Sequence, residues 1–133
     1  MAVFETVRSR QYLAGLSQRV IGCAIEVHRH LGPGLLESVY RRCQAREMQR
    51  CGISVEQEVP IAVTYKEETF DFGFRADLMV EGKVLVELKA VDRLTPVHEA
   101  QLLTYLKLSG LRLGLLLNFN AVPRKNGIRR LVR

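Results

Sequence analysis

The chain has 133 residues, 47% of them hydrophobic and 26% charged, which is the balance of one folded domain rather than of a disordered chain. Its net charge of +6 favours a polyanionic partner, although a basic domain without such a partner would have the same composition. Three cysteines without zinc-binding spacing, no signal-peptide pattern and no apolar run of ~20 residues indicate a reduced, cytoplasmic protein that does not enter a membrane. We therefore expect a single domain over residues 1–133.

Two helices are expected before the strands begin. Apolar residues at helical spacing predict a first helix that starts at the N-cap residue Ser17 and ends at Gly32. A second helix is expected from about Leu35 to Arg50, with Gly52 in the position just after its end.

The second helix has a polar stripe at i, i+3, i+4 and i+7, made of Glu37, Tyr40, Arg41 and Gln44. Glu37 and Arg41 at i,i+4 spacing would form at most a weak surface ion pair. Tyr40 has two interpretations, because a tyrosine here is either a site residue or half-buried packing.

A hairpin is expected next, with strands at 61–65 and 70–74 around a loop at 66–69. Phe70, Phe72 and Phe74 alternate along the second strand and share one face. We expect this face to be part of the core rather than a stacking platform for bases. Arg75 follows, where it would contact a phosphate or hold a neighbouring carboxylate.

The residues from Asp77 to Lys89 form a second hairpin around Gly82. A two-residue turn would place Asp77 opposite Leu88, among apolar side chains. A three-residue loop at 81–83 places Asp77 opposite Glu87 and leaves one face of the hairpin wholly apolar. The hydrophobic pattern therefore predicts the second register, in which Asp77, Glu87 and Lys89 converge.

A third helix is expected from Pro96, capped by Thr95, to Ser109, followed by a buried strand at 113–118. Gln101 and Tyr105 share one face of this helix at i,i+4 spacing. Such a pair is often only part of a polar helix surface.

Three motifs in this order resemble the PD-(D/E)xK nuclease superfamily. They are GxxExxY from Gly34 to Tyr40, D…ExK from Asp77 to Lys89, and QxxxY from Gln101 to Tyr105. The nearest likeness is to the family named for GxxExxY, from about Leu16 to the end of the chain. The resemblance implies an α/β (α+β) fold with a restriction-endonuclease-like αβββαβ core, in which helices flank a central mixed sheet.

The resemblance also implies a Mg²⁺-dependent nuclease, with Mn²⁺ as a substitute. Asp77, Glu87 and the main-chain carbonyl of Leu88 would bind the ion, and Glu37 would bind it directly or through water. Lys89 would act on the attacking water or on the charge of the phosphate. The expected substrate contacts are Gln101, Tyr105, Tyr40 and Arg75.

The expected substrate is nucleic acid, DNA before RNA, and a homodimer or a protein partner is a further expectation. The alternative is a non-catalytic domain that binds nucleic acid or a protein partner on the same scaffold. In that case Glu87 and Lys89 would form an ordinary surface ion pair worth ~0–1 kcal/mol.

Overall fold

The protein folds around a five-stranded mixed sheet in a computed structural model that describes residues 2–133. The sheet has the strand order β1-β4-β5-β6-β7, in which β5 and β6 are parallel and the other neighbours are antiparallel. Its strands are β1 (Val55–Pro60), β4 (Arg75–Val80), β5 (Val84–Lys89), β6 (Leu113–Asn118) and β7 (Ile128–Val132). A short 3-10 helix, Lys125–Gly127, precedes β7. The predicted α+β architecture is confirmed.

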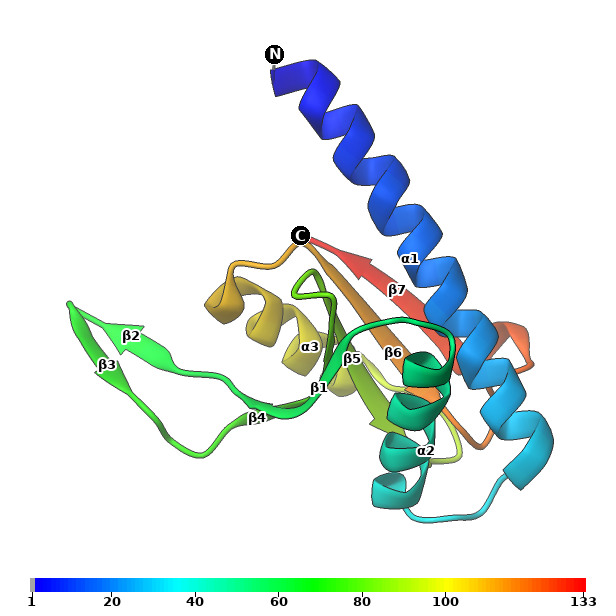
Figure 1. Ribbon diagram of the computed structural model, residues 1–133. Helices are drawn as coiled ribbons and strands as arrows, with labels where there is room; N and C mark the ends of the chain where they lie inside the picture. Colours follow the sequence, from blue (N-terminus) through cyan, green and yellow to red (C-terminus); the bar gives the residue numbers. More distant parts are fainter. Residues whose placement is uncertain (1) are drawn as a thin grey trace.

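Three helices cover the two faces of this sheet (Figure 1). They are α1 (Ala2–Leu31), α2 (Glu37–Arg50) and α3 (Pro96–Ser109). Helices α1 and α2 pack with Leu78, Val86 and Leu115 in the larger core, whereas α3 packs with Leu85 and Leu116 in a second one. The alternation of side chains along the strands divides the apolar residues between these two layers.

Helix α1 begins at Ala2, so the prediction that Ser17 caps its N-terminus was wrong. The Ser17 hydroxyl instead donates a hydrogen bond to the Ala14 carbonyl inside the helix at 3.0 Å. The first turns of α1 project beyond the rest of the molecule (Figure 1). The sequence there has only weak helical periodicity, so the pattern did not indicate a helix before Ser17. No helix of the described chain is long and apolar enough to cross a bilayer.

The ends of the other helices follow their capping signals. Gly52 follows α2 with a φ of 78°, and Gly110 follows α3 with a φ of 75°. At the start of α3, the Thr95 N–H donates to His98 Nδ1 at 3.1 Å as part of a capping box, and Pro96 occupies the first turn. These predicted boundaries are confirmed to within two residues.

The central hairpin has the three-residue loop predicted from the sequence. Val80 pairs with Val84, and Leu78 pairs with Val86. Glu81 and Gly82 in the loop have φ values of 54° and 65°, and the Lys83 N–H donates to the Val80 carbonyl at 2.9 Å. This register places Asp77 opposite Glu87 across the two strands.

A second hairpin, β2 (Val63–Tyr65) and β3 (Glu68–Phe70), projects from the body as an arm (Figure 1). It forms its own two-stranded sheet, and its base is closed by a hydrogen bond of 2.9 Å from the Ile61 N–H to the Phe74 carbonyl. The prediction that Phe72 and Phe74 belong to the core was wrong, because they are 62% and 43% exposed. The alternating pattern identified a common face but not what would cover it.

Candidate active site

The candidate site lies where β4 and β5 stop pairing. Their backbone ladder runs from Val80 and Val84 to Leu78 and Val86, and the next opposed residues are Asp77 and Glu87. At these two residues, hydrogen bonds to the side chains replace the bonds between the two backbones. The Asp77 N–H donates to Glu87 Oε1 at 2.9 Å, and the Leu88 N–H donates to Asp77 Oδ2 at 2.7 Å.

The backbone next to Asp77 is also irregular on its other side. In β1, Gln57 pairs with Leu78 and Val59 with Ala76, so that Glu58 lies between the paired residues. Glu58 has a φ of 51°, a conformation that costs energy in a residue with a side chain. Regular backbone pairing is therefore interrupted on both sides of Asp77, toward β1 and toward β5.

The two carboxyl groups are close together, Glu87 buried and Asp77 half-buried, which shifts their protonation. Glu87 is only 5% exposed. Burial, and then the charge of Asp77, raise the pKa of Glu87 to about 8. Burial is also the largest cause that raises the pKa of Asp77, and the charge of Glu37 adds to it. A nearby cation would relieve this repulsion and hold both groups ionised.

The positive charge of Lys89 acts on both carboxyl groups. Its charge lowers the pKa of Asp77 and of Glu87, but less than burial raises it. Lys89 follows Glu87 on the same face of β5, the face covered by α3. The Leu88 carbonyl lies on the edge of β5 that faces Asp77, because the N–H and C=O of one strand residue point to the same neighbour.

Glu37 reaches this region from the first turn of α2, on the other side of the sheet. Its Oε2 accepts a hydrogen bond of 3.3 Å from the N–H of Ala90, the residue after Lys89. The three carboxylates do not form one compact cluster, since no group of three or more Asp, Glu, His or Cys side chains in the described part of the chain could hold a metal ion. Asp77 and Glu87 are the close pair, and Glu37 is an outer carboxylate.

A buried asparagine that was not predicted as a site residue supports the loop after Lys89. Asn118, at the end of β6, is 1% exposed and pairs in register with Lys89. Its Oδ1 accepts from the Val91 N–H at 3.1 Å, and its Nδ2 donates to the Val91 carbonyl at 2.8 Å. The only signal in the sequence was a single polar residue that ends an apolar run.

Gln101 and Tyr105 extend the site along α3. Gln101 Nε2 lies 3.5 Å from the Tyr105 hydroxyl. Burial raises the pKa of Tyr105, and the charge of Glu87 raises it further. Tyr105 therefore lies near enough to Glu87 to sense its charge, on the face of the sheet where Glu87 and Lys89 point.

Tyr40 and Arg75 have other partners in the fold. Tyr40 is fully buried, and its hydroxyl donates to the Gly32 carbonyl and accepts from the Leu35 N–H at 3.2 Å. Its ring stacks on Phe119 with centroids 4.6 Å apart. Arg75 is exposed at the start of β4, where it forms an ion pair of 3.2 Å with Asp71.

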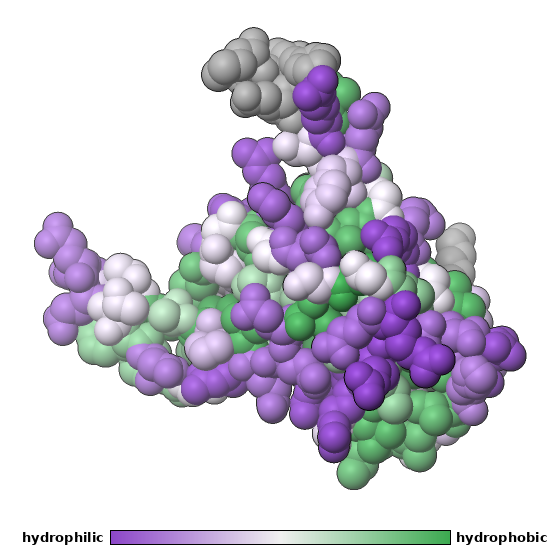
Figure 2. Space-filling model, in the orientation of Figure 1, coloured by the Kyte–Doolittle hydropathy of each residue, from purple (hydrophilic) through white to green (hydrophobic). Residues whose placement is uncertain are grey.

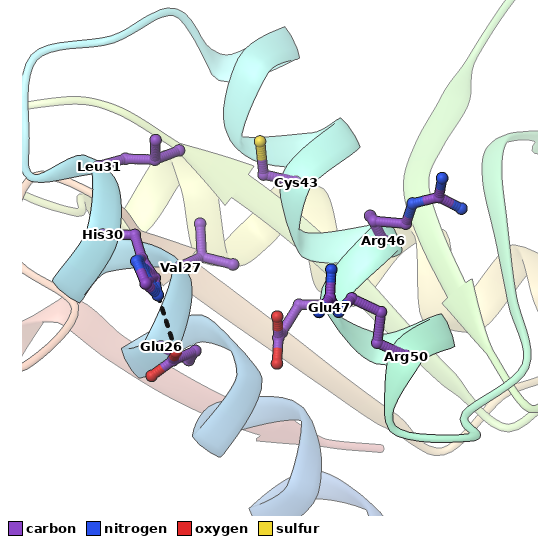
Figure 3. A pocket seen from close by; sticks show the side chains of 8 residues that line it. All are labelled: Glu26, Val27, His30, Leu31, Cys43, Arg46, Glu47 and Arg50. Carbon is purple, nitrogen blue, oxygen red and sulfur yellow. Dashed lines mark hydrogen bonds and ion pairs between the residues drawn. The ribbon is translucent and has the colours of Figure 1, made fainter.

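A separate cavity of about 190 Å³ lies between α1 and α2 (Figure 3). Val27, Leu31 and Cys43 give it apolar walls, and the His30 Nε2 to Glu26 Oε2 contact of 3.0 Å lies at its edge. Its lining does not include Asp77, Glu87 or Lys89. This cavity is therefore separate from the candidate site.

Comparison with known proteins gives one match. The family model described as the PD-(D/E)XK nuclease superfamily matches residues 14–131. Neither the curated proteins nor the solved structures include a significant match to the chain. The matched segment contains all the residues discussed for the candidate site.

Proposed function

Because the chain belongs to the PD-(D/E)XK nuclease superfamily, we propose that it is a Mg²⁺-dependent nuclease that hydrolyses phosphodiester bonds of DNA. The observation that carries this proposal is the close pair of a partly buried and a buried carboxyl group, Asp77 and Glu87, held by each other's strands beside Lys89. Within the superfamily we assign the chain to the GxxExxY family on the residues from Gly34 to Tyr40. We treat residues 1–133 as one nuclease domain.

The donor set fits a hard divalent cation. PD-(D/E)XK nucleases generally use divalent metal ions, and Mg²⁺ prefers oxygen ligands, few of them from protein. Asp77, Glu87 and the Leu88 carbonyl would hold the ion, with Glu37 as an outer carboxylate and Mn²⁺ as a substitute. When bound, the ion would neutralise phosphate charge and lower the pKa of a water molecule.

The remaining residues position and polarise the substrate. Lys89 donates hydrogen bonds from Nζ to the attacking water or to a phosphate oxygen on which negative charge develops. Gln101 and the Tyr105 hydroxyl hold the phosphate, and they are already in contact with each other. Arg75 contacts the strand at the entrance to the site.

We assign Tyr40 a positioning role rather than a substrate contact. Its hydroxyl already bonds the backbone of Gly32 and Leu35. These bonds hold the turn that leads into α2, which begins at Glu37. Tyr40 therefore acts on the site through the placement of Glu37.

The test is hydrolysis of labelled single-stranded, double-stranded and branched DNA by the purified protein with Mg²⁺ or Mn²⁺, with RNA as a parallel substrate. Asp77→Asn keeps an acceptor oxygen for the Leu88 N–H and removes the charge, so we expect a loss of at least about 100-fold in cleavage rate. Glu56→Gln, at an exposed carboxylate of β1, is the matched control for loss of one carboxylate charge. Full activity of Asp77→Asn would refute the assigned roles, and salt-dependent binding without cleavage would favour a non-catalytic binding domain.

A further inference from the structure

We propose that the arm forms a stacking surface for unpaired bases, so that single-stranded or frayed nucleic acid is the preferred substrate. This inference rests on the proposed nuclease function and names the substrate class for the same site. The surface, called the aromatic row below, consists of Tyr65, Phe70, Phe72 and Phe74, and it ends against the buried ring of Tyr105 in α3.

The rings of the aromatic row follow one another in contact. The centroids of Phe70 and Phe72 are 5.4 Å apart with their planes at 16°. Phe72 and Phe74 are 6.3 Å apart, and Phe74 and Tyr105 are 6.2 Å apart. Because Val63 pairs with Phe70 and Tyr65 lies two residues further along β2, Tyr65 continues the row toward the tip of the arm.

Much of the row is open to solvent. Tyr65 is 63% exposed, Phe72 is 62% exposed and Phe74 is 43% exposed. Figure 2 shows apolar surface along the projecting arm, bordered by hydrophilic residues at its tip. Exposed aromatic clusters of this kind mark interaction sites, and an isolated two-stranded hairpin is only marginally stable alone. The arm therefore needs a partner to cover its rings.

The position of the row identifies the partner. The row ends at Tyr105, which packs in one buried cluster with Ala76 and Leu85. These two residues lie near Asp77 and Glu87 along β4 and β5. A strand whose phosphate lies between Asp77 and Lys89 has its neighbouring nucleotides beside Tyr105 and Phe74. Nucleic acid is the substrate class of the superfamily, and successive unpaired bases stack on aromatic side chains in a sequence-tolerant manner.

The charges around the row are consistent with a nucleic-acid strand that runs from the candidate site along the arm. At its base, Arg75 is two residues from Asp77 and neutralises Asp71 in an ion pair of 3.2 Å. At the tip, Lys66 lies over the ring of Tyr65 at 5.5 Å, but Glu67 and Glu68 are adjacent to it. Phosphate contacts are therefore expected at the base of the arm, whereas the middle of the row contacts bases.

A tryptophan in the row would report stacking directly. The chain has no tryptophan, so Phe72→Trp introduces a single indole ring into the row, whose fluorescence can be excited apart from that of the tyrosines. In EDTA, where cleavage is excluded, addition of oligo-dT or oligo-U should quench its fluorescence, because a base that stacks on the indole ring contacts it face to face. Blunt duplex DNA of equal length should quench it much less, because its bases are already paired and stacked.

Two controls separate base stacking from charge. Tyr12→Trp places the fluorophore at an exposed residue of α1, a helix that lies apart from the arm (Figure 1), and should not respond. An abasic strand of the same length keeps the phosphates and removes the bases, so it should not quench Phe72→Trp. Equal quenching by the abasic strand, or by duplex DNA, would overturn the proposal.

Binding affinities provide an independent measurement. Phe72→Leu with Phe74→Leu keeps an apolar surface but removes two ring faces, and we expect affinity for oligo-dT to fall roughly 5- to 100-fold. Val97→Ala, at a 75% exposed residue of α3, is the control for loss of apolar surface. Unchanged affinity in the leucine variant would overturn the proposal. So would fluorescence of Phe72→Trp that changes with protein concentration but not with added oligonucleotide, because a second copy of the chain would then cover the row.

The outcome is distinguishable from failure of the nuclease assignment. Quenching by oligo-dT without any metal-dependent cleavage would leave the stacking surface standing and remove the hydrolytic function. Cleavage of duplex DNA at full rate by the leucine double variant, with unchanged binding of single strands, would leave the hydrolytic function standing and remove the stacking surface.

Discussion

Asp77 and Glu87 complete the hydrogen bonding of each other's strands. The Asp77 N–H donates to Glu87 Oε1 at 2.9 Å, and the N–H of Leu88, next to Glu87, donates to Asp77 Oδ2 at 2.7 Å. Each carboxyl group is therefore part of the sheet as well as of the candidate metal site. Substitutions that keep an acceptor oxygen separate these two roles from each other.

At position 77, alanine should destabilise the metal-free protein more than asparagine does. Asp77→Ala leaves the Leu88 N–H without its acceptor in a partly buried position, at a cost of about 1–2 kcal/mol relative to Asp77→Asn. Urea denaturation in EDTA measures the difference. Equal stabilities of the two variants would show that the hydrogen bond does not support the sheet.

The raised pKa of Glu87 predicts that stability without metal falls as the pH rises. The folded state holds a proton on Glu87 up to a pKa of about 8, whereas the unfolded state releases it near 4.5, so folding is favoured less and less between these values. Thermal unfolding in EDTA from pH 5 to pH 8 should show this decline.

Glu87→Gln provides the matched test of this pH dependence. It keeps the acceptor for Asp77 and cannot ionise, so its Tm should change less with pH and exceed that of the wild type at pH 8 by at least ~4 °C, the shift expected for about 1 kcal/mol. Glu56→Gln, at an exposed residue of β1, should keep the wild-type slope. An unchanged slope in Glu87→Gln would assign the pH dependence to other groups.

Lys89 should be required for cleavage but not for ion binding. Lys89→Ala removes the donor to water or phosphate and leaves Asp77, Glu87 and the Leu88 carbonyl in place. We expect a cleavage rate lower by roughly 100-fold or more, with the Mg²⁺-dependent rise in Tm retained. Lys83→Ala in the exposed turn is the control. Loss of both properties would make Lys89 a structural partner of the carboxylates.

Asn118 should stabilise the loop that follows Lys89. Asn118→Ala leaves the Val91 N–H without its acceptor, whereas the Val91 carbonyl keeps the Asn120 Nδ2 donor at 3.3 Å. We expect the substitution to cost about 2 kcal/mol and to speed amide hydrogen exchange at Val91. Asn126→Ala, at an exposed residue, should change neither measurement. Unaltered exchange at Val91 in the Asn118 variant would contradict the role.

Tyr40→Phe distinguishes a positioning residue from a substrate contact. The substitution keeps the ring stacked on Phe119 and removes the hydroxyl bonds to Gly32 and Leu35, at a cost of about 1–2 kcal/mol. Because the hydroxyl is buried, we expect KM for the nucleic acid to stay within about twofold of the wild type and kcat to fall only through displacement of Glu37. A rise in KM alone would restore the substrate-contact interpretation.

The elements with strong local signals were predictable from the sequence. The hairpin register followed from alternation on one face and from Gly82 in the loop, and α3 followed from Thr95 and Pro96 at its start. In each case the residues that determine the structure lie within a few positions of it. The superfamily resemblance rests on the order of such local motifs along the chain.

The remaining features depend on residues far apart in the sequence. Whether the row that contains Phe72 is buried depends on whether any helix covers the arm, and none of the described helices does. Asn118 matters because it pairs with Lys89 across two parallel strands. The sequence of either strand alone does not determine the register between them. Glu37 bonds Ala90, 53 residues later in the chain.

The two chain segments that connect the arm to the body are joined by a backbone hydrogen bond at the base of the arm. Ile61 and Phe74 are joined by a backbone hydrogen bond of 2.9 Å, and the strands beyond them belong to a sheet of their own. Its length is therefore decoupled from the five-stranded sheet, since residues added or removed near the tip do not alter the pairing of β1 with β4. Related chains could vary the reach of this segment and retain the same chemistry.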